Sequence, residues 1–263
     1  MHRLDQLFAH KQEHILSVYF TAGFPKLGDT LPVMKHLQDA GADIIEVGMP
    51  FSDPLADGPT IQESNFQALN NGMTIHTLLD QLKNMREQVT IPVILMGYMN
   101  PIMQYGLERF CKACKEAGVD GLILPDLPMQ EYLDEYKAVF DSYGLYNTFL
   151  ITPQTAESRI RTIDENTRGF IYMVSSASIT GAKKEITPEQ VAYFERINAM
   201  NLSNPRLIGF GISSRDTFAQ ACRYASGAII GSAFIRLLKD SNDLKEAIHR
   251  YIGEVKGIRQ PVN

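Results

Sequence analysis

The sequence alternates short apolar runs with amphipathic segments along almost its whole length, and this alternation constrains the fold more than any other feature. The runs are rich in Ile, Val, Leu and Phe and too short for helices, whereas intervening segments such as residues 129–144 carry apolar side chains at helical spacing. Buried strands that alternate with helices form parallel sheets. The expected strands cover residues 15–21, 43–48, 92–97, 121–124, 147–152, 169–175, 206–211 and 228–232.

Eight such units in a chain of 263 residues predict an α/β fold of the (β/α)8 TIM-barrel class. A doubly wound sheet is the main alternative, but the even pacing of the units favours a closed barrel. Residues 1–12 are expected to form an extra N-terminal helix that covers the bottom of the barrel. No linker or low-complexity segment interrupts the pattern, so residues 1–263 are expected to form a single domain.

Composition excludes several classes of function. The net charge is −5 and no run of Lys or Arg stands out, which argues against binding to nucleic acid. No stretch reaches 18 apolar residues and the N-terminus has no signal-peptide pattern, so we expect a soluble, cytoplasmic protein without a membrane role.

The cysteines and histidines do not predict a metal site. Cys111 and Cys114 form a C-x-x-C pair, which can indicate zinc or redox chemistry. They share one helical stripe with Leu107, Phe110 and Ala117, however, so we expect them to face the core. The six histidines show no ligand spacing.

Glu46 ends an apolar strand, where an unpaired carboxylate is costly. Alternation along the strand places its side chain in the barrel lumen, near the C-terminal strand ends where such barrels hold their working groups. Burial there raises the pKa of a carboxyl toward neutrality, so that it can both donate and accept a proton. A purely structural glutamate bonded to Tyr or Thr is the alternative, although barrel interiors favour branched apolar residues.

The loop after this strand carries Asp53 and Asp57 among Pro50, Pro54 and Gly58. Asp-Pro and Asp-Gly are ordinary turn formers, so either aspartate alone has a structural explanation. The loop nonetheless brings Asp57 over the mouth that Glu46 lines, and two carboxyls in different environments are a recurrent acid–base arrangement.

Two glycine-bearing loops, GFGISS at 209–214 and IIGSAF at 229–234, follow the last two expected strands. In this fold those loops commonly hold phosphate, because glycine lets backbone N–H groups and a helix N-terminus approach an anion. The glycines can also serve only to turn the chain. The small-residue segment at 175–185 has the composition of a mobile lid, and a plain connector is its alternative.

Several motifs resemble one family in the right order along the chain. They are FTAGFP at 20–25, EVGMPFSDPLADGPTIQ at 46–62, MGYMNP at 96–101, PDLP at 125–128, SITG at 178–181, GFGIS at 209–213 and GSA at 231–233. The set is similar to the tryptophan synthase alpha chain family, and the PFSDPLADGP block is highly specific.

The resemblance implies a lyase that cleaves indole-3-glycerol phosphate into indole and glyceraldehyde 3-phosphate by a retro-aldol reaction. Glu46 would be the acid–base group that protonates indole C3 and takes the glycerol hydroxyl proton. Asp57 would bind the indole N–H and stabilise the positive charge that develops there, and Thr180 would contact that aspartate when the lid closes. No metal or organic cofactor is implied for this chain.

The resemblance also implies further contacts to the substrate. The substrate-binding residues would be Tyr19, Met96, Tyr98, Ile123, Tyr172 and Thr180. The phosphate-binding residues would be Gly181, Gly211, Gly231 and Ser232.

A partner is implied as well. The family works with a beta chain that carries pyridoxal phosphate and converts indole and serine into tryptophan, in an assembly of two alpha and two beta chains. The residues expected to face that partner are Asp53, Pro54, Asn100 and Pro101. The chain alone is expected to be a weakly active monomer.

The chain departs from the family pattern in two places. The family segment commonly reads Ser-Arg-x-Gly-Val-Thr-Gly, whereas Ser176, Ala177 and Ser178 here replace the arginine, the variable residue and the first glycine. We expect this change to affect how the lid closes and how the chain responds to its partner. Tyr19 stands where an aromatic residue without a hydroxyl is familiar, so the pocket is expected to be slightly more polar.

Three other functions remain open from the sequence. A synthase that forms indole-glycerol phosphate would need a lysine at a strand end, and the first four expected strands end without one. A non-catalytic subunit that only activates the beta chain would be indicated by loss of Glu46 or Asp57, and both are present. A free-standing indole-3-glycerol-phosphate lyase differs only in its kinetics and partner loops.

Overall fold

The apolar runs form parallel strands. The computed structural model describes residues 1–54, 57–175, 187–209 and 211–258. Their strands are β1 (Ile15–Thr21), β2 (Ile44–Gly48), β3 (Val93–Met96), β4 (Gly121–Ile123), β5 (Tyr146–Thr148), β6 (Leu150–Ile151), β7 (Ile171–Val174), β8 (Arg206–Gly209) and β9 (Gly227–Ile230).

The order of the strands shows how the sheet closes. Neighbouring strands follow the order β5-β4-β3-β2-β1-β9-β8-β7-β6, so β5 and β6 lie at the two ends of the sheet. Only Phe149 separates β5 from β6 in the sequence, and its carbonyl accepts a hydrogen bond from Tyr172 N at 3.0 Å. The fifth expected strand is therefore interrupted once and joins both edges, which confirms the predicted (β/α)8 barrel.

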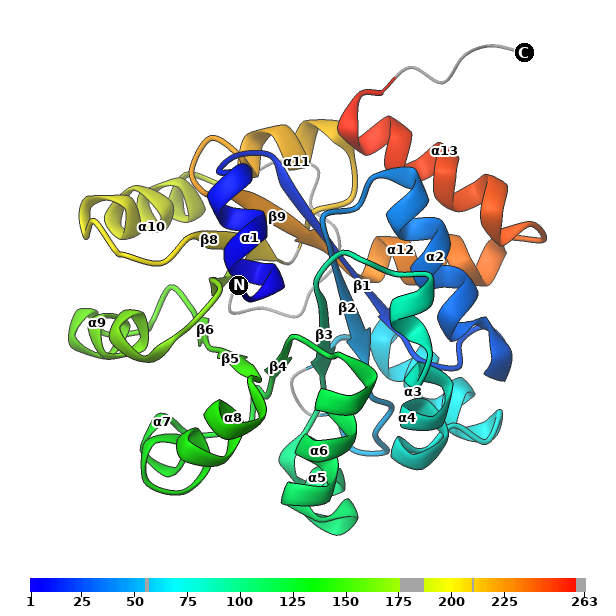
Figure 1. The fold of residues 1–263 in the computed structure, drawn as a ribbon. Coiled ribbons are helices and arrows are strands. Elements are labelled where there is room, and N and C mark those ends of the chain that lie inside the picture. Colours follow the sequence, from blue (N-terminus) through cyan, green and yellow to red (C-terminus); the bar gives the residue numbers. More distant parts are fainter. Residues whose placement is uncertain (55–56, 176–186, 210, 259–263) are drawn as a thin grey trace.

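The helices surround the strands as a ring (Figure 1). The α-helices are α1 (Arg3–His10), α2 (Thr30–Ala40), α3 (Pro59–Asn70), α4 (Ile75–Leu82), α5 (Met99–Tyr105), α6 (Leu107–Ala117), α7 (Met129–Glu131), α8 (Lys137–Tyr143), α9 (Glu157–Asn166), α10 (Pro188–Ala199), α11 (Arg215–Ala221), α12 (Ser232–Asp240) and α13 (Leu244–Lys256). Shorter helical turns are η1 (Leu27–Asp29), η2 (Met85–Glu87) and η3 (Tyr132–Tyr136).

Strand ends differ from the predicted boundaries by a few residues. The expected strand 228–232 is wrong at its end, because β9 stops at Ile230 and Ser232 already begins α12. Gly231 has φ −125° and ψ −86°, a conformation outside the β region that ends the strand and starts the helix.

The cysteines of α6 face the core, as predicted. Cys111 and Cys114 are fully buried together with Phe110. Burial raises the pKa of the Cys111 thiol to about 12 and also raises that of Cys114, which disfavours the thiolate that metal binding or redox chemistry needs.

Alternate strand residues form two apolar clusters, one on each face of the sheet. The inner cluster draws residues from strands all around the barrel, so it must fill the lumen. Its buried members are Leu4, Ile15, Ile44, Ile94, Ile123, Phe170, Tyr172, Val174, Leu207 and Ile229.

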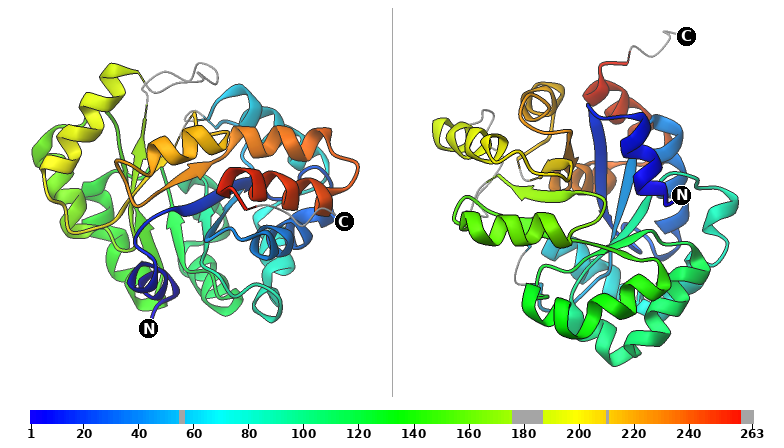
Figure 2. Two further views of the ribbon diagram at one scale, coloured as in Figure 1. Left: turned by 90° about the horizontal axis from the view of Figure 1, so that it is seen from above. Right: turned by 60° about the vertical axis from the view of Figure 1, so that its left-hand side comes forward.

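Helix α1 closes one end of the lumen, as the sequence predicted, and Figure 2 shows it lying across that end of the barrel. Its Leu4 is fully buried within the inner cluster. Beside it, the buried carboxylate of Asp120 accepts hydrogen bonds from Arg3 Nη1 at 3.0 Å and from the Val93 backbone N at 2.8 Å. This closed end leaves the opposite end, where the C-terminal strand ends meet, as the place for a site. In the described ranges, no helix is long and apolar enough to cross a membrane.

Candidate active site

Glu46 points into the lumen from the middle of β2 and is fully buried. Ser17 Oγ on the neighbouring strand donates a hydrogen bond to Glu46 Oε1 at 2.6 Å. The other oxygen, Oε2, has no hydrogen-bond partner among the described residues. Burial raises the pKa of Glu46 to about 7, and the bond from Ser17 only partly opposes this rise.

Asp57 lies directly before the N-terminus of α3 and is only 8% exposed. Its backbone N donates to Pro54 O at 3.1 Å, and Gln62 Nε2 donates to Asp57 O at 2.9 Å, so the turn around it is tied at both sides. Tyr98 Oη donates to Asp57 Oδ2 at 3.3 Å. Burial raises the pKa of Asp57 to about 6.

Two buried tyrosines, Tyr19 and Tyr172, complete the polar part of the lumen. Tyr19 is the register partner of Glu46 across β1 and β2. Burial is the main cause that raises the pKa of both phenols. The negative charges of Glu46 and Asp57 raise it further. The two carboxyls and the two phenols therefore share one poorly solvated space, and both phenols stay protonated at neutral pH.

Both phenols require a glycine on the facing strand. A Cβ atom at Gly48 would lie 2.6 Å from Tyr19 Cζ, and a Cβ atom at Gly209 would lie 2.5 Å from Tyr172 Cζ. These distances are far below van der Waals contact, so any side chain at either glycine would displace a ring.

The expected apolar wall is also present. Met96 is half-buried at the end of β3 and Ile123 is fully buried at the end of β4, and the two are register partners. Met96 is in turn the register partner of Gly48, beneath the Tyr19 ring. Tyr98 is the N-cap residue of α5, and its ring packs against that of Phe51 in a tilted arrangement, with 5.3 Å between the ring centroids. An aromatic substrate would meet apolar surface here and carboxyls opposite.

Some of the predicted phosphate contacts can be located. Gly211 is exposed and has φ +81°, a left-handed conformation that suits glycine. Gly231 caps the N-terminus of α12, which begins at Ser232, and a helix N-terminus attracts anions. A Cβ atom at Gly231 would lie 3.7 Å from Tyr19 Cδ1, so this helix end borders the pocket. Thr180 and Gly181, like the lid residues Ser176, Ala177 and Ser178, lie outside the described residues.

The four residues expected to face a partner differ in exposure. Asp53 and Asn100 are exposed and Pro101 is half-buried, whereas Pro54 is buried. The Pro54 side chain therefore belongs to the interior of this chain, where its carbonyl supports Asp57.

Sequence reasoning missed Ser17 and Ser64, which support the site from within the barrel wall. Ser17 is fully buried in β1 and bonds Glu46. Its only sequence signal is a polar residue in the apolar run ILSVYFT, on the same face as Tyr19. Ser64 on α3 bonds Thr21 at the end of β1, and nothing in the amphipathic pattern of the helix indicates that contact.

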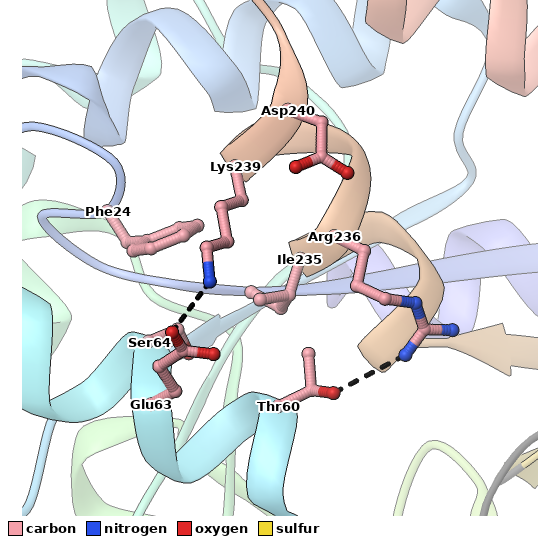
Figure 3. A pocket seen from close by; sticks show the side chains of 8 residues that line it. All are labelled: Phe24, Thr60, Glu63, Ser64, Ile235, Arg236, Lys239 and Asp240. Carbon is pink, nitrogen blue, oxygen red and sulfur yellow. Dashed lines mark hydrogen bonds and ion pairs between the residues drawn. The ribbon is translucent and has the colours of Figure 1, made fainter.

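Outside the barrel wall, α3 and α12 enclose a hollow of about 250 Å³ (Figure 3). Lys239 Nζ donates to Glu63 Oε1 at 2.6 Å across it, and Arg236 Nη1 donates to Thr60 Oγ1 at 3.4 Å. These contacts join the helix that follows Asp57 to the helix that begins at Ser232. Among the described residues, no group of three or more His, Cys, Asp or Glu is placed to hold a metal ion.

Comparison with known proteins gives a consistent result. The model of the family described as "Tryptophan synthase alpha chain" matches residues 5–261. The chain is 57% identical over 256 residues to the tryptophan synthase alpha chain of Flavobacterium johnsoniae, covering 97% of this chain and 100% of that one. It is 56% identical over 256 residues to that of Parabacteroides distasonis, with the same coverage of both chains.

Solved structures agree with the sequence comparison. The crystal structure of the tryptophan synthase alpha chain from Legionella pneumophila has a TM-score of 0.87 and 35% identity, covering 98% of this chain and 97% of that one. A crystal structure of tryptophan synthase from M. tuberculosis in an aminoacrylate-bound form has a TM-score of 0.85 and 29% identity, covering 98% of this chain and 100% of that one.

Proposed function

This chain belongs to the tryptophan synthase alpha chain family, and we propose that Glu46 and Asp57 share the acid–base and electrostatic work of its reaction. The chain is an indole-3-glycerol-phosphate lyase, a carbon–carbon lyase of tryptophan biosynthesis. The alpha chain family uses no cofactor, since pyridoxal phosphate belongs to the beta chain. The observation that carries the proposal is the pair of buried carboxyls with pKa values of about 7 and about 6.

Glu46 acts as the proton shuttle of the cleavage. With a pKa of about 7, it holds a proton in much of the enzyme at neutral pH and can give that proton to indole C3. The resulting carboxylate then takes the proton of the glycerol hydroxyl as the carbon–carbon bond breaks. The Oε2 atom has no hydrogen-bond partner among the described residues. This supports the role, because the substrate can reach Oε2 without breaking an existing hydrogen bond. The proton balance closes within the site, since Glu46 ends the reaction protonated.

Asp57 stabilises the charge that C3 protonation creates. Protonation at C3 leaves positive charge on the indole nitrogen, and an ionised carboxylate in a poorly solvated site stabilises it strongly. The lower pKa of about 6 supports this division of roles, because Asp57 ionises before Glu46 as pH rises. Tyr98 holds Oδ2 from one side, which leaves Oδ1 for the indole N–H.

The phosphate end of the substrate binds at the start of α12 in this proposal. Gly231 and Ser232 offer backbone N–H groups and the positive end of the helix, and Gly211 adds exposed backbone opposite. Tyr19 lies between Gly231 and Gly48 and so separates the phosphate end from the carboxyl end of the pocket. Thr180 and Gly181 stay predicted contacts.

A tryptophan synthase beta chain is the partner we propose, in an assembly of two alpha and two beta chains. Asp53 and Asn100 are exposed on the mouth side of β2 and β3, where indole would leave. Met103 lies one helical turn after Asn100 on α5 and is 51% exposed, so it would add apolar surface to the same face. A cytoplasmic location, expected from the sequence, stays a prediction.

Indole release from indole-3-glycerol phosphate by the purified chain, alone and with its beta chain, tests the partner proposal. We expect slow release alone and a sharp rise in kcat as the beta chain is added, saturating at one beta chain per alpha chain. Fast release that the beta chain leaves unchanged would indicate a free-standing lyase and contradict the coupling. No release in either condition, with tryptophan formation from added indole still accelerated, would indicate a non-catalytic activating subunit instead.

A further inference from the structure

Tyr19 is wedged between two glycines. Its Cδ1 atom would lie 3.7 Å from a Cβ atom at Gly231, and its Cζ atom would lie 2.6 Å from one at Gly48. The ring therefore crosses the lumen wall from the start of α12 to the end of β2, and its hydroxyl lies over Gly48. The ring has little freedom to move, so the position of the hydroxyl is fixed by packing.

A chain of hydroxyl groups leads away from this phenol. Thr21 is the register partner of Gly48 and is fully buried, and its side chain is hydrogen-bonded to the Tyr19 phenol. Thr21 accepts in this bond, because its own proton goes to Ser64. Thr21 Oγ1 lies 2.6 Å from Ser64 Oγ, which in turn donates to Ile61 O at 2.8 Å. Buried hydroxyls that satisfy one another in this way fix the elements that carry them. Tyr19, Thr21 and Ser64 are called the hydroxyl chain below.

The hydroxyl chain ends on the first turns of α3, whose N-terminus follows Asp57 directly. Ile61 also reaches the pocket, since its Cδ1 would lie 3.9 Å from a Cβ atom at Gly231. Ser64 faces the hollow between α3 and α12 on its other side, as Figure 3 shows. The hydroxyl chain is thus a buried polar connection between β1 and the helix that sets where Asp57 lies.

We propose that the hydroxyl chain positions Asp57, so that Tyr19 is a positioning residue for the cleavage in addition to lining the pocket. This inference rests on the role proposed for Asp57. The charge of Asp57 is the largest electrostatic cause of the raised pKa of Tyr19, which is consistent with their closeness. An Asp57 that is displaced loses the hydrogen bond from Tyr98 Oη, which lowers its pKa, so loss of the hydroxyl chain should raise the pKa of Asp57.

Tyr19→Phe, Thr21→Val and the double variant test this inference through kcat, KM and the acid limb of the pH profile of kcat/KM. We expect each single variant to lower kcat about threefold to tenfold, the usual effect of one hydrogen bond, and to move the acid limb to higher pH. The double variant should be no worse than the worse single variant, because both act through one chain. Ser64→Ala removes the last hydroxyl of the chain, on α3, and should lower kcat and move the acid limb as Thr21→Val does.

Thr30→Val is the matched control. Thr30 is also fully buried, and its hydroxyl accepts a hydrogen bond from Gly23 N at 3.0 Å, but its contacts do not lead to the lumen. We expect it to lower thermal stability while kcat and the acid limb stay unchanged.

Three outcomes would overturn the inference: an unchanged acid limb and kcat in Tyr19→Phe, additive losses in the double variant, or an equal acid-limb shift in Thr30→Val. A fully active Asp57→Asn variant would instead remove the proposed role of Asp57, so the two failures are distinguishable.

Discussion

Replacing Glu46 with glutamine is expected to slow cleavage of indole-3-glycerol phosphate by about 10²–10⁴-fold, the usual effect of losing one essential acid–base group. Glutamine is nearly isosteric and can still accept the bond from Ser17 Oγ, so the pocket keeps its shape. It cannot give a proton to C3 or take one from the glycerol hydroxyl. Single-turnover indole release at pH 7 measures the loss, and binding of glyceraldehyde 3-phosphate should stay within about twofold as the control. Unchanged turnover would remove Glu46 from the chemistry.

Glu46→Gln should also be more stable than the parent above neutral pH. A melting curve that shows this would confirm that the variant is folded. The pKa of Glu46 is raised from 4.5 to about 7, so the folded state binds the proton more tightly than the unfolded chain. Stability is therefore lost as pH rises from about 4.5 to about 7, by an amount on the order of 3 kcal/mol. Glutamine cannot ionise and avoids this loss. We expect the melting temperatures to agree near pH 4 and to diverge at pH 8, with Glu46→Gln the higher.

Asp57→Asn is expected to lower kcat about 10²-fold, with a smaller change in KM. Asparagine keeps one oxygen, which can accept from the indole N–H, and its amide group can donate to Tyr98 Oη in place of the bond that Oδ2 accepted, so the substrate still binds. It has no negative charge to stabilise the protonated indole, and that stabilisation is needed mainly in the transition state. Steady-state kinetics of the isolated chain measures the split between kcat and KM.

Asp80→Asn is the matched control for this variant, because Asp80 is an exposed aspartate on the outer helix α4, paired with Lys83. It removes the same charge far from the lumen and should leave both constants unchanged. An equal fall in kcat for the two variants, or a loss confined to KM in Asp57→Asn, would contradict the electrostatic role.

Much of the fold followed from local patterns in the sequence. Alternation along Asp43–Gly48 sufficed to place Glu46 in the lumen, because a strand has only two faces and the other carries Ile45 and Val47. The extra helix could be predicted because its apolar residues precede the first strand, and Leu4 indeed enters the lumen. The segment TPEQ at 187–190 is a local signal of the same kind, because its Thr and Gln form the capping box that starts α10.

Features that depend on contacts distant in sequence could not be predicted in this way. The bond from Ser17 to Glu46 joins residues 29 apart, and the bond between Thr21 and Ser64 joins residues 43 apart. The break at Phe149 separates β5, which pairs with β4, from β6, which pairs with β7, and this division depends on strands far apart in the sequence. Pro54 was expected to face a partner from the family resemblance, and its burial could not be predicted from the turn residues around it.

The roles of the site residues were proposed from the family resemblance and stay predictions, as does the single domain over residues 1–263. The predicted lid departs from the family pattern. Ser176 and Ser178 stand where the family commonly has arginine and glycine, and both lie outside the described residues. The carboxyls, in contrast, lie on β2 and at the head of α3, so their positions are set by the barrel itself.

The pH dependence of kcat/KM for indole release by the isolated chain tests the central claim most directly, namely that one buried carboxyl works protonated and the other ionised. Activity should rise as Asp57 ionises near pH 6 and fall as Glu46 loses its proton near pH 7, which gives a narrow bell. In Asp57→Asn the residual activity should keep the alkaline limb and lose the acid limb. A flat profile between pH 5 and pH 8, or an acid limb that persists in Asp57→Asn, would contradict this division of roles.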